Sequence, residues 1–120
     1  MPIQFEMPMR LKSIANASQQ GNWRQRAKDK RQQRQNAFLY SIAAISNKRN
    51  LLPRDLIPAK VTIVRVGKKM MDDDNLAISA KAVRDGVADA LGVDDGDRTK
   101  VTWAYDQEIG KAYAVKVSIQ

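Results

Sequence analysis

Two clusters of acidic residues are the parts of this sequence best suited to chemistry. One is Asp72-Asp73-Asp74-Asn75 and the other is Asp94-Asp95-Gly96-Asp97. The 120-residue chain has no histidine and no cysteine. This composition excludes Ser–His and Cys–His nucleophile pairs, disulfides, and zinc or iron–sulfur sites built from those ligands. Carboxylate oxygens remain, and oxygen ligands suit magnesium, manganese or calcium.

Each acidic cluster also has a purely structural explanation. Aspartate is favoured at helix N-caps and in first turns, where the helix dipole is positive, and Asp and Gly both suit turns. A cap requires only one aspartate, however, and three adjacent carboxylates repel one another. Neither cluster has the Gly and Glu spacing of an EF-hand loop, so that type of calcium site is excluded.

The segment between the two clusters is predicted to be one amphipathic helix over residues 75–91, ending at Gly92. Its apolar residues recur at helical spacing, and Asp74, Lys81 and Asp85 fall on the opposite face. Lys81 and Asp85 form either an exposed ion pair or part of a carboxylate metal site with a lysine beside it. A straight helix of 17 residues spans about 25 Å, and residues 93–95 are too few to return that distance. We therefore expect any metal site to be shared between two subunits related by a two-fold axis.

The remaining segments predict a small α/β (α+β) fold. Residues 3–9, 59–66, 99–105 and 112–119 have the composition of strands, and the last two are expected to form a hairpin. Residues 23–47 predict a helix, whose second half carries the apolar stripe Phe38, Ile42 and Ile45. The expected order is β-α-β-α-β-β, a single domain over residues 1–120 with one mixed sheet and two helices.

Charge is divided unevenly along the chain. Residues 1–71 carry 15 Lys and Arg against 3 Asp and Glu, whereas residues 72–120 carry 6 against 10. A pI of about 10.0 with clustered cations is typical of nucleic-acid binding, and an anionic membrane surface is the main competing partner. The first half of the long helix is either a solvated end or a phosphate-binding surface, and we favour the latter. The predicted phosphate contacts are Arg24, Arg26, Lys28, Lys30, Arg31, Arg34, Lys68 and Lys69.

The run Asp72-Asp73-Asp74-Asn75-Leu76, followed by Lys81, Asp85 and Asp94-Asp95, resembles the RusA family of phage-type Holliday-junction resolvases. The resemblance implies a magnesium-dependent endodeoxyribonuclease (manganese being the alternative ion) that resolves four-way DNA junctions by paired nicks in recombination and repair. It also implies catalytic metal ligands at Asp72, Asp74 and Asp95, with Lys81 assisting cleavage. A homodimer in the cytoplasm of a bacterial or phage-infected cell, with no membrane association, is expected. Three residues between Leu76 and Lys81, numbers 77–79, are additional to the family pattern.

Two other functions are consistent with the same residues. The chain could be a non-catalytic DNA- or RNA-binding accessory protein that retains the fold. It could also be a small basic scaffold whose acidic clusters only cap a helix and shape a turn. Dependence of activity on magnesium separates the enzyme from both alternatives.

Overall fold

Strands form where β-branched and aromatic residues recur, and the longest helix forms where Ala, Gln, Lys and Arg run without Gly or Pro. The computed structural model describes residues 2–12, 23–48 and 51–120. Its order confirms the predicted β-α-β-α-β-β succession, with the second helix in two pieces and a short 3-10 helix added before the second strand. The elements are β1 (Ile3–Met7), α2 (Trp23–Ser46), η1 (Pro53–Leu56), β2 (Ala59–Gly67), α3 (Asp73–Ser79), α4 (Lys81–Leu91), β3 (Val101–Ile109) and β4 (Ala114–Ile119).

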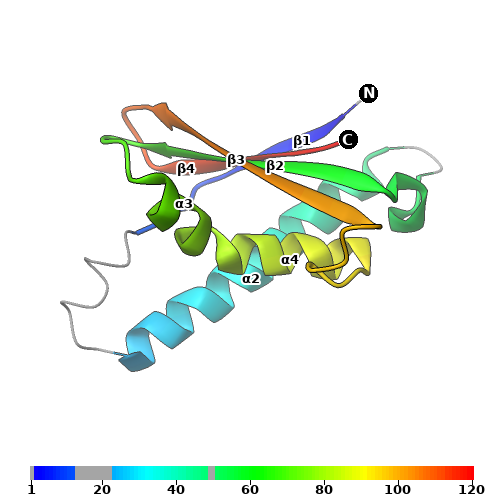
Figure 1. The fold of residues 1–120 in the computed structure, drawn as a ribbon, viewed down its shortest axis with the longest axis horizontal. Coiled ribbons are helices and arrows are strands. Elements are labelled where there is room, and N and C mark those ends of the chain that lie inside the picture. The colour runs from blue at the N-terminus through cyan, green and yellow to red at the C-terminus, as the bar shows by residue number, and fades with distance from the viewer. Residues whose placement is uncertain (1, 13–22, 49–50) are drawn as a thin grey trace.

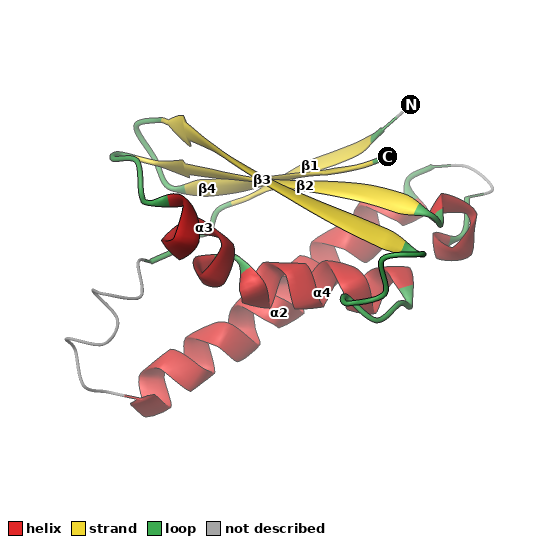
Figure 2. Ribbon diagram, in the orientation of Figure 1, coloured by secondary structure: helices red, strands yellow, loops and turns green. Residues whose placement is uncertain are grey.

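The four strands form one mixed sheet in the order β1-β4-β2-β3. β2 and β3 are parallel, with Ile63 opposite Tyr105, while β4 is antiparallel to both β1 and β2. Helices α2 and α4 lie against the same face of this sheet (Figure 1). Figure 2 shows the resulting two layers, strands on one side and helices on the other. Buried aliphatic side chains between the layers, among them Val61, Ile63 and Val87, form the core.

The predicted hairpin between the last two strands is wrong. β3 pairs with β2 alone, and β2 separates β3 from β4. The chain crosses the end of β2 after β3, where the Gly110 N–H donates to the Gly67 carbonyl at 2.9 Å. A Cβ on Gly110 would lie 2.6 Å from a Val66 methyl carbon, so glycine is needed for this close crossing. The short connection from β3 to β4 can therefore pass the end of β2, because neighbouring strands are only about 4.8 Å apart.

The helix predicted over residues 75–91 is also not a single straight helix. α3 ends at Ser79 and α4 begins at Lys81, with Ala80 between them at φ −91° and ψ 0°. The Ser79 hydroxyl donates to the Leu76 carbonyl at 2.8 Å, a local bond that competes with regular helix continuation. Ala80 itself is fully buried, so the break is packed against the core.

The long helix α2 crosses α4 at a glycine. A Cβ on Gly86 would lie 2.3 Å from the Arg34 carbonyl oxygen and 2.7 Å from the Ala37 Cβ. The buried residues of α2 are Ala37, Ser41 and Ile45. Of the three residues in the predicted apolar stripe, burial is therefore confirmed for Ile45. Phe38 and Ile42 are only half-buried, because the close crossing turns the small residues toward α4. The N-terminal half of α2 diverges from the sheet (Figure 1).

Candidate functional site

The first acidic cluster lies where β2 leads into α3. Asp72 is the N-cap residue of α3, and its backbone carbonyl accepts from Leu76 N at 2.9 Å. Its side chain makes no capping hydrogen bond. Asp73 and Asp74 occupy the first turn, where the positive end of the helix dipole favours negative charge. All three side chains are exposed, and within the described part of the chain none is paired with a cation.

Two side chains that the sequence reasoning missed hold the segment in front of this cluster. The Gln107 amide donates to the Met71 carbonyl at 2.7 Å and accepts from Met71 N at 2.9 Å. Arg65 Nη1 donates to the Lys69 carbonyl at 2.8 Å. Arg65 is only 7% exposed, and none of the described carboxylates pairs with it. Arg65 occupies an inward-facing position in the alternating pattern of the strand Ala59–Gly67. That position is the sequence signal that could have identified it.

The second acidic cluster folds back toward the start of α4. Lys81 Nζ lies 2.6 Å from Asp85 Oδ1 and 2.8 Å from Asp95 Oδ2. Residues 93–95 therefore turn back along α4, which is 11 residues long, far enough for Asp95 to reach Lys81 at its start. The exposed i,i+4 ion pair between Lys81 and Asp85, one of the two predicted alternatives, is present.

Arg84 and Trp103 also hold Asp95 in place. Arg84 Nε lies 2.9 Å from Asp95 Oδ2, and Arg84 Nη2 donates to the Asp95 carbonyl at 2.9 Å. The same carbonyl accepts from the Trp103 indole N–H at 2.9 Å, and the guanidinium lies 5.0 Å from the centre of that ring. Asp94 and Asp97 form turns, accepting from Gly96 N and Thr99 N at 3.0 Å each. The structural explanation of this cluster as a turn is thus correct for those two residues.

These contacts keep both Lys81 and Asp95 charged. The Lys81 ammonium, hydrogen-bonded to Asp95, lowers the pKa of that carboxyl below its usual value, against the opposing effect of burial. Hydrogen bonds from Lys81 to Asp85 and then to Asp95 raise the lysine pKa. Lys81, expected to assist cleavage, is therefore committed to two carboxylates in this structure.

The three carboxylates that the resemblance marks as metal ligands do not form one site within a single chain. Among the residues described, no group of three or more acidic side chains is placed to hold a metal ion. Asp95 lies with Lys81 and Arg84, whereas Asp72 and Asp74 lie at the other end of α3. The donor set of one chain alone does not fit a three-carboxylate magnesium or manganese site.

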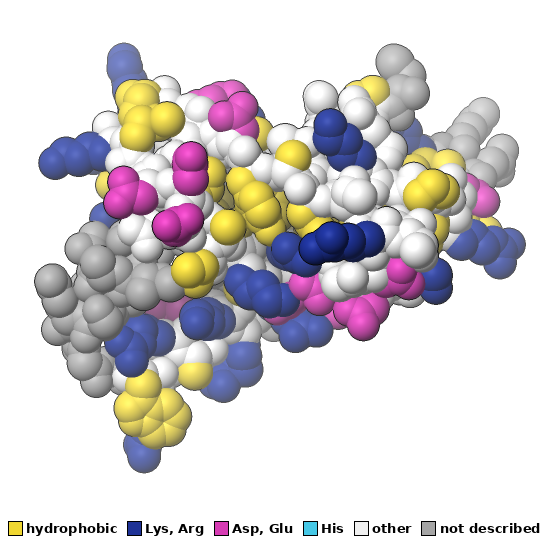
Figure 3. All heavy atoms as spheres, in the orientation of Figure 1, with side chains coloured by type: hydrophobic (Ala, Val, Ile, Leu, Met, Phe, Trp, Pro, Cys, Tyr) yellow, Lys and Arg dark blue, Asp and Glu magenta, His cyan; other side chains and the backbone are white. Residues whose placement is uncertain are grey.

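A basic groove of about 770 Å³ lies between the N-terminal half of α2 and the junction of α3 with α4. Its polar lining includes more cations than acids, the acids being Asp29 and Asp85. Figure 3 shows acidic side chains gathered over α3 and basic side chains over the neighbouring part of α2. Arg24 and Lys28 are exposed on α2 but do not line the groove. The lining cations are Lys12, Arg26, Lys30, Arg31, Arg34 and Lys81.

Arg34, one of the predicted phosphate contacts, has a carboxylate partner within the fold. Its Nε and Nη2 donate to the two carboxylate oxygens of Asp89 at 2.8 and 3.0 Å. This two-pronged pair joins α2 to α4 next to the Gly86 crossing and raises the Arg34 pKa above its ordinary value. Arg34 therefore helps to hold the groove wall together.

Lys68 and Lys69 follow the end of β2 and do not line this groove. Lys68 Nζ is 5.8 Å from the centre of the Tyr113 ring, and Arg10 lies 4.4 Å from the same ring. The end of β2, α3 and the start of α2 all lie toward one end of the long axis of the molecule (Figure 1). The acidic cluster at α3 is thus flanked by two basic regions.

Comparison of the chain with protein-family models, with curated proteins and with solved structures gave no match. No helix in the described residues has the length and apolar character needed to cross a lipid bilayer.

Proposed function

We propose that this protein binds branched DNA through the basic groove and, as the resemblance to RusA resolvases implies, cuts it in a magnesium-dependent reaction. The observation that carries the binding part is the groove itself, where Lys12, Lys30 and Arg31 line one continuous depression with little opposing charge. A row of cations in a depression neutralises phosphates and releases their counterions, which drives nucleic-acid binding. Four-way junctions are the substrate class that the resemblance implies.

The cutting part rests on the exposed carboxylates of Asp72 and Asp74, which the resemblance marks as metal ligands. They stand beside the basic groove on α3, and neither is consumed by an ion pair in the described residues. Unpaired carboxylates at a surface that attracts DNA are unfavourable for binding alone, because they repel phosphates. Divalent cations that accept oxygen ligands would remove that repulsion. A homodimer is part of this proposal, since one chain does not gather three acidic ligands.

A non-catalytic DNA- or RNA-binding protein is the second candidate. The observation that favours it is the pairing of Asp95 and Lys81 with each other at 2.8 Å. Both residues belong to the catalytic set that the resemblance implies, and each is occupied by a protein partner. A chain that lost cleavage while keeping its fold would leave these groups to stabilise the 94–97 turn.

One experiment separates the two candidates. A labelled four-way junction and a linear duplex of equal length are incubated with the protein, with and without magnesium, and both binding and nicking are measured. We expect Asp74→Asn to abolish nicking and to leave binding unchanged or slightly tighter, because one negative charge leaves the cluster. Asp73→Asn is the matched control, since it removes the same charge from a position that the resemblance does not mark as a ligand.

Three outcomes decide the matter. Nicking by the wild type and by Asp73→Asn, but not by Asp74→Asn, supports the nuclease. Magnesium-independent binding without nicking supports the accessory protein. Absence of binding to either DNA rejects the nuclease and restricts the accessory protein to RNA.

A further inference from the structure

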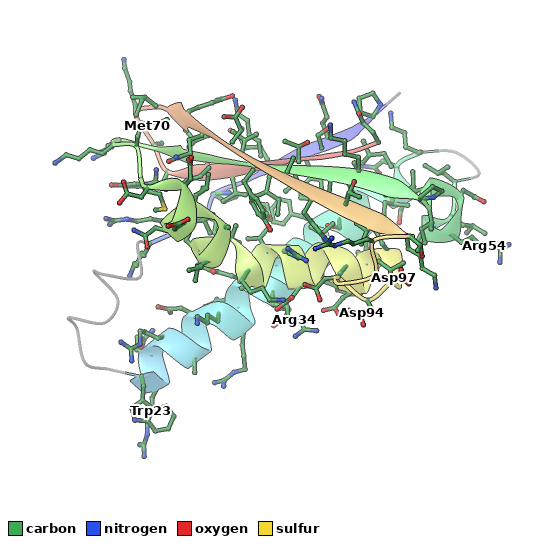
Figure 4. All side chains as sticks on the ribbon, viewed as in Figure 1. Trp23, Arg34, Arg54, Met70, Asp94 and Asp97 are labelled. Carbon is green, nitrogen blue, oxygen red and sulfur yellow. The ribbon has the colours of Figure 1, made fainter. Side chains whose placement is uncertain are left out.

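Trp23 is the most exposed large apolar side chain in the described structure. It is the first residue of α2, and 65% of its surface is exposed. Figure 4 shows it at the tip of α2, directed away from the sheet. The Arg24 guanidinium lies 5.5 Å from the centre of its ring, within cation–π range.

The other tryptophan, Trp103, has a structural role in this fold and serves as a comparison. Trp103 is half-buried, its indole N–H donates to the Asp95 carbonyl, and Arg84 packs on its ring. Within the described residues Trp23 has no such hydrogen bond, and its ring is open to solvent. A single exposed apolar residue is common in proteins, so its surroundings decide whether it carries an inference.

Those surroundings are cationic and otherwise almost free of apolar residues. Over residues 23–36 of α2 the only apolar residue besides Trp23 is Ala27. A helix that lies on a membrane needs a continuous apolar face, and this segment has none. Aromatic rings set among cations are instead typical of surfaces that bind unpaired nucleic-acid bases, where the ring stacks and the cations hold the phosphates.

From this placement we infer that Trp23 stacks on an unpaired base of a nucleic acid whose backbone lies along the cations of α2. The inference rests on the proposed DNA binding and deepens it by naming single-stranded or locally unstacked segments as the preferred target. The ring at the tip of the helix contacts the base, while Lys30 and Arg31, exposed farther along α2, contact phosphates. Recognition of this kind tolerates any base, since every base presents a flat face.

The test compares single-stranded oligothymidylate with a blunt duplex of the same length, both fluorescently labelled. We expect Trp23→Ala to weaken single-strand binding at least about fivefold and to leave duplex binding unchanged. Trp23→Phe should recover most of the affinity, because a phenyl ring still stacks. In a Trp103→Phe background, where Trp23 is the sole indole, single-stranded DNA should quench tryptophan emission and the duplex should not. Leu39→Ala is the control, since Leu39 is a 52% exposed apolar residue of the same helix outside its basic half.

Every outcome separates this inference from the proposed function. If wild type binds neither DNA, the inference fails, and binding to the four-way junction then decides the proposed function separately. If wild type binds both DNAs and Trp23→Ala is as tight as wild type, only the stacking is rejected. An equal loss on single strand and duplex also rejects stacking, because it reports altered charge or helix position. Binding of Trp23 to phosphatidylserine vesicles, with no response to DNA, would identify a membrane surface as the partner.

Discussion

At the scale of single residues, Arg65 is the least expected feature of the molecule. Burying a guanidinium at an inward-facing position of a central strand costs free energy unless its hydrogen bonds are satisfied. Here the acceptors are the carbonyls of Lys69 and Leu11 and the Gln107 side chain. Gly67 makes room, because a Cβ there would lie 2.6 Å from the Arg65 guanidinium. The charge is therefore used to hold the backbone that leads to the acidic cluster.

Replacing Arg65 tests this anchoring role. We expect Arg65→Met to lower the free energy of unfolding by about 1–3 kcal/mol, because buried carbonyls lose their donor. Amide hydrogen exchange of residues 69–72 should accelerate more than that of β4. Urea unfolding and exchange measurements check the two effects. Arg54→Met, an exposed change in η1, is the control and should shift stability by less than about 0.5 kcal/mol. Equal exchange in wild type and Arg65→Met would contradict the anchoring role.

The ion pair between Asp95 and Lys81 predicts a pH dependence of stability. The pKa of Asp95 is lowered in the folded state by its hydrogen bond from Lys81. The stabilisation of the folded state by ionised Asp95 is thus fully present above the pKa of about 3.9 that Asp has in the unfolded chain. It is lost as the pH falls through the lower pKa of the folded state. Asp95→Asn should cost at most about 1 kcal/mol at pH 7, since the pair is partly exposed, and the difference should vanish in acid. Urea unfolding from pH 2 to pH 7 measures it, with Asp73→Asn as control. A difference that stays constant across this range would show that Asp95 acts through packing alone.

At the scale of elements, the crossing of α2 over α4 depends on the missing side chain of Gly86. Alanine is favoured over glycine within a helix by about 1 kcal/mol, so local preference alone predicts that Gly86→Ala stabilises the protein. A Cβ 2.3 Å from the Arg34 carbonyl forces the two helices apart instead. Net destabilisation of about 1–3 kcal/mol is expected, measured as a lower unfolding midpoint. Gly96→Ala is the control, because its Cβ would have no contact closer than 3.6 Å. A stabilised Gly86→Ala protein would show that the crossing adjusts freely.

At the scale of the whole molecule, the basic groove lies toward one end of the long axis, and we propose that this end binds DNA. Trp23 and Arg54 mark opposite ends of the long axis (Figure 4). We expect affinity for DNA to fall steeply with salt, and Lys30→Ala with Arg31→Ala to flatten that slope by up to about 0.9 per lost phosphate contact. Arg54→Ala removes one positive charge at the far end and should leave the slope near that of wild type. The slope of log affinity against log salt concentration, measured by fluorescence anisotropy, decides whether the cations of α2 or the net charge alone governs binding.

A further prediction concerns two copies of the molecule. The distance argument for a shared site assumed one straight helix, and the break at Ala80 corrects that assumption. One chain nevertheless does not bring three acidic ligands together in its described residues, so we expect two subunits to complete each site. Mixing inactive Asp74→Asn with inactive Asp95→Asn and allowing subunit exchange should restore junction nicking, because one site of the mixed dimer is then intact. A mixture that stays inactive would show that each subunit builds its own site.

The sequence by itself determined the succession of elements, the division of charge and the two acidic segments on either side of the second helical region. These depend on the spacing and type of neighbouring residues, which local periodicity reports directly. Only the tertiary structure decided that β2 lies between β3 and β4, that the helix breaks at Ala80, and that Asp95 returns to Lys81. It also decided the roles of Arg65, Gln107 and Arg84. Most of these features arise from contacts between residues far apart in the chain, which leave little trace in the local pattern, whereas the break also involves the local bond from Ser79 to Leu76.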